Sequence, residues 1–82
     1  MSKNRPTRRE RFDGAQSTVE DAKSEMEELR DELQNWLDNM PENLQQSQKA
    51  SELEDAISNL EDIISSLDDA VGTDVEFPGM MG

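Results

Sequence analysis

A seven-residue repeat in the second half of the chain constrains the fold more than any other feature. Three consecutive heptads each begin with a leucine: Leu53-Glu-Asp-Ala-Ile-Ser-Asn, Leu60-Glu-Asp-Ile-Ile-Ser-Ser and Leu67-Asp-Asp-Ala-Val-Gly-Thr. In heptad notation, with positions a to g, the leucines occupy d, and position a is occupied by Ile57, Ile64 and Val71. Apolar residues at a and d line one side of an α-helix that packs on another helix. The pattern predicts a helix over residues 47–71, with Ser47 as its N-cap and Gly72 at its end.

The first half of the chain has the same spacing. Position a holds Phe12, Val19, Met26, Leu33 and Met40, and position d holds Ala15, Ala22, Leu29 and Trp36. Pro41 ends this helix. Two capping boxes, Thr7-Arg-Arg-Glu10 and Ser17-Thr-Val-Glu20, compete for its start. Because Gly14 lies between them and weakens a helix, we predict a helix over residues 17–40 that frays toward Phe12.

Charges at the flanking positions indicate how the two helices pair. Antiparallel helices set e against e, and the 17–40 helix has Lys23 and Arg30 there, whereas the 47–71 helix has only acids at e: Glu54, Glu61 and Asp68. The fold class predicted is therefore all-α, an antiparallel two-helix hairpin of coiled-coil type with a loop over residues 41–46. We favour the register that places Val19 opposite Leu67, and a register one heptad away remains an alternative.

A hairpin of this size buries little apolar surface, so a further partner is expected. Leu37 at e and Ile63 at g widen the apolar face beyond the a and d positions, as in a helix covered by a third or fourth neighbour. Two hairpins could dimerise into a four-helix bundle, or one hairpin could dock on a different protein. A parallel two-stranded coiled coil through the 47–71 helix is a competing interpretation, since β-branched residues at a and leucine at d favour it.

Composition excludes several classes of chemistry. The chain of 82 residues has no Cys and no His, which removes disulfides, thiol nucleophiles and imidazole catalysis, and we predict neither a cofactor nor a metal site nor enzymatic activity. The net charge is -12, which argues against nucleic acid or membrane binding by the body of the protein. No apolar run suited to a signal peptide or membrane span occurs, so a cytoplasmic location is expected.

Acidic pairs form a ladder along the 47–71 helix. Its outermost members, at position f, are Asp55, Asp62 and Asp69, about 10 Å apart at 1.5 Å per residue. Such spacing could imitate nucleic-acid phosphates, collect divalent cations weakly, or form a solvated surface, which is the ordinary explanation for a charge run.

The two ends of the chain carry the remaining candidate sites. Residues 1–14 are predicted to form a basic flexible arm whose phosphate-binding candidates are Arg5, Arg8, Arg9 and Arg11. Nucleic acid is a candidate partner only through this arm. The alternative is that the arm packs against the acidic body of the protein. Residues 73–82 should form an extended tail in which Phe77 and Met80 either anchor in a partner or fold back on the hairpin. Trp36, at d, is expected in the core, with a binding role as the alternative.

Two short motifs carry a resemblance. The stretch Asn39-Met-Pro-Glu-Asn-Leu-Gln-Gln-Ser through Leu60-Glu-Asp-Ile-Ile-Ser-Ser-Leu67, followed by Val75-Glu-Phe-Pro-Gly-Met, resembles small acidic proteins of unknown role in tailed bacteriophages. The resemblance covers about half of the chain and implies an origin in an infected bacterium. It implies no activity and no site residue.

Together these features predict a non-enzymatic protein–protein interaction protein. A phage-type accessory or inhibitory protein of the bacterial cytoplasm fits the acidic hairpin, with another protein or a second copy as its partner. Two alternatives remain open: a structural or virion assembly component that oligomerises through the heptads, and a nucleic-acid mimic that occupies a DNA-binding protein. The candidate partner-binding residues are Trp36, Leu37, Asp55, Asp62, Ile63, Asp69, Phe77 and Met80.

Overall fold

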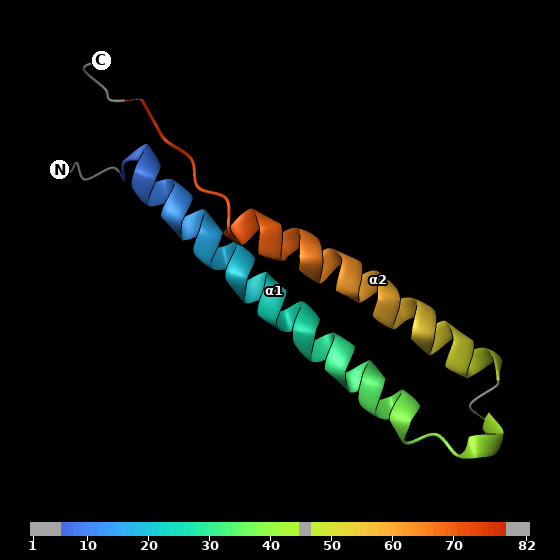
Figure 1. The fold of residues 1–82 in the computed structure, drawn as a ribbon. Helices are drawn as coiled ribbons and strands as arrows, with labels where there is room; N and C mark the ends of the chain where they lie inside the picture. The colour runs from blue at the N-terminus through green and yellow to red at the C-terminus, as the bar shows by residue number, and fades with distance from the viewer. Residues whose placement is uncertain (1–5, 45–46, 79–82) are drawn as a thin grey trace.

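A computed structural model, which describes residues 6–44 and 47–78, shows an all-α hairpin. Its elements are the helix α1 (Arg8–Asp38), the short 3-10 turn η1 (Glu42–Leu44) and the helix α2 (Gln48–Val71). The two helices lie side by side and antiparallel, so the N-terminal end of α1 and the tail after α2 lie at the same end (Figure 1). The predicted antiparallel hairpin is thereby confirmed.

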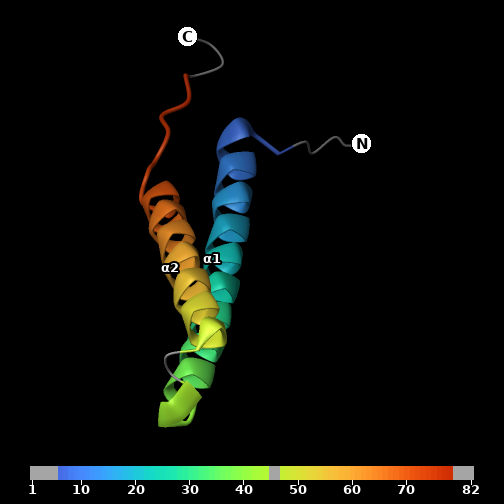
Figure 2. The same ribbon diagram turned by 90° about the vertical axis from the view of Figure 1, so that its right-hand side faces the viewer.

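The hairpin is a single layer of two helices. Its extents are 67 × 25 × 14 Å, and the view turned by 90° shows α1 and α2 crossing at a shallow angle with no third element on either side (Figure 2). In one layer, each helix can bury only the side that faces the other. Both broad sides of the hairpin are therefore open within the described chain.

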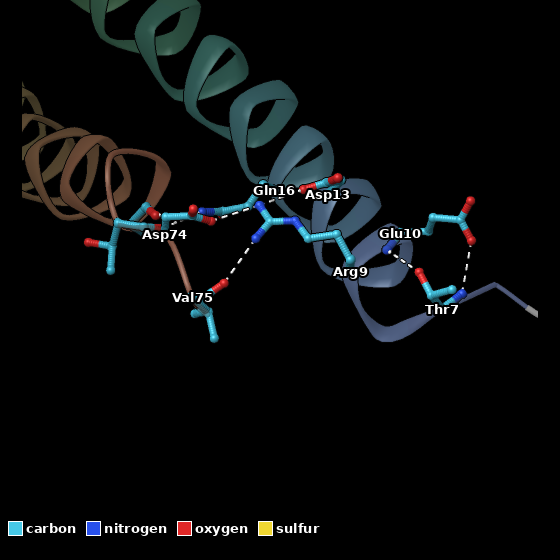
Figure 3. Close-up of polar contacts among 9 residues, drawn as sticks. Thr7, Arg9, Glu10, Asp13, Gln16, Asp74 and Val75 are labelled. Atoms are coloured by element: carbon cyan, nitrogen blue, oxygen red, sulfur yellow. Dashed lines mark hydrogen bonds and ion pairs between the residues drawn. The ribbon is translucent and has the colours of Figure 1, made fainter. Parts of the chain in front are cut away.

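The first capping box, not the second, starts α1. The Thr7 hydroxyl accepts a hydrogen bond from the backbone N–H of Glu10 at 3.0 Å, and the Glu10 carboxylate accepts one from the N–H of Thr7 at 2.9 Å (Figure 3). The predicted start at residue 17 is wrong. Residues 8–14, which were predicted to belong to a flexible arm, are helical. Gly14 costs a helix about 1 kcal/mol, and a complete cap together with contacts to the tail outweighs that cost. Residues 1–5 lie outside the described residues.

Replacing Thr7 with alanine should loosen this end of α1. The substitution removes the cap acceptor, which costs about 1 kcal/mol of helix stability, so the backbone amides of residues 8–11 should exchange with water about fivefold faster. Hydrogen exchange followed by NMR measures this. Ser17→Ala is the matched control: Ser17 is exposed in the interior of α1, where alanine is the better helix former. The opposite pattern, with only Ser17→Ala opening the helix, would place the start at residue 17.

The other helix ends follow the sequence more closely. α1 ends at Asp38, two residues before the predicted end, and Pro41 follows. Ser47 caps α2 as predicted, since its hydroxyl accepts from the N–H of Ala50 at 3.3 Å. Gly72 occupies the predicted C-terminal position, and its N–H donates to the carbonyl of Asp68 at 3.0 Å.

The buried residues of the described chain all lie on α2. They occupy a and d, as the repeat predicts, and comprise Ala50, Leu53, Ile57 and Ile64. α1 contains no buried residue. Its half-buried side chains at a are Phe12, Val19, Met26 and Leu33, and those at e are Gln16, Lys23, Arg30 and Leu37. α1 therefore turns a and e, not a and d, toward α2.

Candidate functional site

An exposed apolar surface runs along one broad side of the hairpin. It consists of the d positions of α1 and the g positions of α2, and we call it the d/g face: Ala15, Ala22, Leu29 and Trp36 with Ala56, Ile63 and Ala70, all exposed except the half-buried Ala56. Its large side chains Leu29, Trp36 and Ile63 are 41%, 51% and 41% exposed. Lys49, which also occupies g, holds its Nζ 5.8 Å from the centre of the Trp36 ring. That contact shows that the d side of α1 and the g side of α2 share one side of the hairpin.

The exposure of the d positions corrects two predictions. Trp36 was expected to pack in the core, and it lies half exposed on the surface with Lys49 over its ring. Leu37 was expected to share one wide face with Ile63, but Leu37 is half-buried at e, which flanks the contact on the side opposite to g. The cause is the rotation of α1 toward its e positions. Two of the four d residues are alanines, whereas Lys23 and Arg30 have long apolar stems that cover more of α2.

The predicted e-to-e ion pairing forms at one of two bases. Lys23 Nζ lies 3.0 Å from Asp68 Oδ1 across the helix pair. The hydrogen bond to Asp68 is the main reason that the pKa of Lys23 is raised. Arg30 instead pairs with its neighbour Asp31 at 3.0 Å, and within the described chain it makes no ion pair with Glu54 or Glu61.

A second cluster joins the tail to the first turns of α1, and we call it the tail clasp. The Arg9 guanidinium donates to Asp74 at 2.7 Å, to Asp13 at 3.0 Å and to the carbonyl of Val75 at 2.9 Å (Figure 3). The Phe77 ring meets Phe12 edge to face, with centroids 5.7 Å apart. Of the two alternatives for the tail, the structure favours folding back on the open end of the hairpin.

Gln16 extends the clasp to the end of α2. Its side-chain amide donates to the carbonyl of Ala70 at 2.8 Å and to that of Thr73 at 3.0 Å (Figure 3). The carbonyl of Ala70 also accepts from the N–H of Thr73 at 3.2 Å, so Gln16 adds a second donor at the end of α2 and ties the first residue of the tail to α1. Neither Gln16 nor Asp74 was singled out from the sequence, because each acts through a contact between distant parts of the chain.

The tail clasp engages one of the arginines that were predicted to bind phosphate. Arg9 is occupied by the tail, and its side chain also lies 5.3 Å from the centre of the Phe12 ring. Arg8 and Arg11 are exposed on the first turns of α1. Arg5 and Met80 lie outside the described residues.

Protonation of Asp74 should open the clasp. The hydrogen bond from Arg9, followed by that from the N–H of Val75, lowers the pKa of this carboxyl below its ordinary value. A lowered pKa means that the contribution is present above the ordinary value and is lost as the pH falls through the lowered one. NMR signals of the Phe77 ring should therefore shift toward those of a free ring only below the usual range for aspartate.

Asp74→Asn is the control for this titration. The clasp should be weakened at neutral pH, and the acid transition of the Phe77 signals should disappear. Persistence of the same transition in the variant would assign it to another carboxyl and contradict the role of Asp74.

The acidic row remains on the outside of α2. Asp55, Asp62 and Asp69 are all exposed, and none makes an ion pair with a described lysine or arginine. The described residues contain no group of three or more His, Cys, Asp or Glu side chains placed to hold a metal ion. Over the same residues, neither helix has the length and apolar character needed to cross a membrane.

Comparison of the chain with protein-family models, with curated proteins and with solved structures finds no match. The geometry of the d/g face, the tail clasp and the acidic row therefore carries the functional argument.

Proposed function

We propose that this protein is a non-enzymatic interaction protein, an acidic helical hairpin that binds another protein chain through its d/g face. The observation that carries the proposal is the gathering of Leu29, Trp36 and Ile63, each about half exposed, on one side of a single helical layer. Apolar side chains grouped on a surface mark protein contact sites. Tryptophan is also among the residues that contribute most to binding energy when a partner buries them.

The acidic surface and the phage resemblance support a particular kind of interaction protein and a place where it acts. An accessory or inhibitory protein of an infected bacterium, acting in its cytoplasm, agrees with a small hairpin that carries a net charge of -12. Strong like charge keeps such a chain soluble and disfavours indiscriminate contacts. The d/g face then supplies the specific contact.

Site-specific crosslinking tests the proposal directly. A photoreactive amino acid in place of Leu29, in bacterial cells that produce the protein, should form a covalent adduct with one other chain, either a different protein or a second copy. The same amino acid in place of Ser65 is the control, because Ser65 is exposed at position b on the opposite part of α2. Adducts at Ser65 but not at Leu29 would overturn the d/g face as the binding surface.

A second candidate function is nucleic-acid mimicry by Asp55, Asp62 and Asp69. The exposure of this row and its lack of described ion pairs support it, since an acid not engaged within the hairpin can meet a basic groove. If the row mimics phosphates, the protein should compete with duplex DNA for a basic DNA-binding protein, and competition should fall steeply with salt. The triple asparagine variant should lose competition, and Glu20, Asp21 and Glu28 changed to their amides form a control of equal charge. Equal losses would indicate bulk charge alone.

A further inference from the structure

In the middle of the d/g face, large and small side chains alternate across the two helices. Lys49 lies over Trp36, and Gln16, next to Ala15, reaches the carbonyl of Ala70, so these contacts fix which residues share a level along the hairpin. Between the level of Trp36 and that of Ala15, each step of one heptad along both helices defines another level. At these levels Leu29 lies beside Ala56, and Ala22 lies beside Ile63. At these two central levels one helix presents a large side chain and the other a small one, whereas the outer levels pair Trp36 with Lys49 and Ala15 with Ala70.

We propose that a second copy of the chain covers the d/g face, related by a twofold axis that runs along the hairpin. This inference rests on the proposed function, because it names the occupant of the same surface. In this arrangement α1 packs on α2 of the second copy, the two loops lie at one end, and the result is a four-helix bundle in which neighbouring helices are antiparallel.

The sizes of the side chains fit this axis. A rotation about the long axis keeps every residue at its own level, so Leu29 meets Ala56 of the second copy and Ala22 meets Ile63 of the second copy. Facing layers that pair a large with a small side chain interdigitate without voids. Each pair occurs twice, because a twofold interface uses the same surface on both copies.

The charges along the edge of the face disfavour the other simple stacking. A twofold axis across the hairpin would lay α1 on α1 of the second copy and set Glu25 and Glu32, which occupy g, against their own counterparts. Like charges facing each other oppose association. The lengthwise axis instead places these acids beside α2, whose residues along that edge include Lys49, Glu52, Asn59 and Ser66. Glu25 then meets uncharged side chains, and Glu32 meets the ion pair of Lys49 with Glu52, whose Nζ and Oε1 are 3.7 Å apart.

Exchanging the sizes of one pair between two chains tests the inference. Ala22→Ile should crowd the interface and Ile63→Ala should leave a void, so each variant alone should dimerise at least about tenfold more weakly than the parent. In an equimolar mixture, one contact pairs the new isoleucine with the new alanine and the other is native. Native mass spectrometry of the full chains should therefore show mainly the mixed dimer, at twice the chain mass of 9.3 kDa.

The distance between labels on the two copies measures the orientation of the twofold axis. The chain has no cysteine, so Asn43→Cys introduces a single label near the loop. Labels on the two copies should be close together for the lengthwise axis. A separation near the 67 Å length of the hairpin would overturn it in favour of the crosswise axis.

Failure of this inference is distinguishable from failure of the proposed function. A chain that stays monomeric at every concentration, or a mixture without excess mixed dimer, overturns the second copy as the occupant. If the Leu29 crosslink then joins a different protein, the interaction function stands. Circular dichroism of both variants checks that they remain helical, and the label measurement on the otherwise unchanged chain decides the matter if either variant is not.

Discussion

Replacing Ile64 with alanine should unfold most of the hairpin, whereas the same change at the adjacent Ile63 should leave it folded. Among the described residues, Ile64 is one of four buried side chains and is 9% exposed, while Ile63 is 41% exposed. Truncating a buried isoleucine to alanine costs about 2–5 kcal/mol. This is a large fraction of the free energy of unfolding of a chain of this size. Thermal unfolding followed by circular dichroism, at concentrations where the chain is monomeric, measures the difference.

The two isoleucines form a matched pair, since they share residue type, helix and neighbourhood. Repeating the measurement at high concentration should show Ile63→Ala losing the part of the stability that depends on concentration. Equal destabilisation of the dilute chain by both substitutions would mean that α2 turns a different side toward α1, and that the d/g face is not exposed.

The buried side of α2 was predictable from the repeat because the choice there is unambiguous. Leu53, Ile57 and Ile64 are large, and the positions between them are mainly acids, serines and alanines. Only one rotation of the helix buries these three residues and leaves the acids in water, and it leaves Ile63 exposed. Ser47 and Gly72 were predictable for a similar reason, since caps act through atoms within one turn.

The rotation of α1 was not predictable from its spacing. With alanine at two d positions, the apolar pattern scarcely distinguishes a helix that turns a and d inward from one that turns a and e inward. The ion pair between Lys23 and Asp68 and the half-burial of Leu37 accompany the second choice. Both depend on contacts between the helices, which heptad letters assign only approximately.

The start of α1 depends on residues at the far end of the chain. Both capping boxes were visible in the sequence, and Gly14 favoured the later one. The structure uses the earlier box because Arg9 and Phe12 are held by Asp74 and Phe77, more than sixty residues away. Gln16 was missed as a site residue for the same reason. A local pattern contains no information on which distant segment will cover a helix end.

Replacing Phe77 with alanine should expose the first turns of α1. Ala15 and Ala70 share a level, so the turns before Ala15 extend beyond the end of α2 and are supported by the tail alone (Figure 1). The edge-to-face contact between Phe77 and Phe12, with the apolar surface it covers, contributes about 2 kcal/mol. Amides of residues 11–18 should therefore exchange about thirtyfold faster, while those in the middle of α2 should change little.

Val75→Ala is the matched control in the same tail, because Val75 acts through its backbone carbonyl and its side chain is 39% exposed. It should leave exchange nearly unchanged. Combining Phe12→Ala with Phe77→Ala should cost less than the sum of the single changes, since the contact is lost only once. Strict additivity, or no effect of Phe77→Ala at all, would mean that the tail does not dock on α1 in solution. Phe77 would then be available to anchor the chain on a partner, and the alternative role of the tail would replace the clasp.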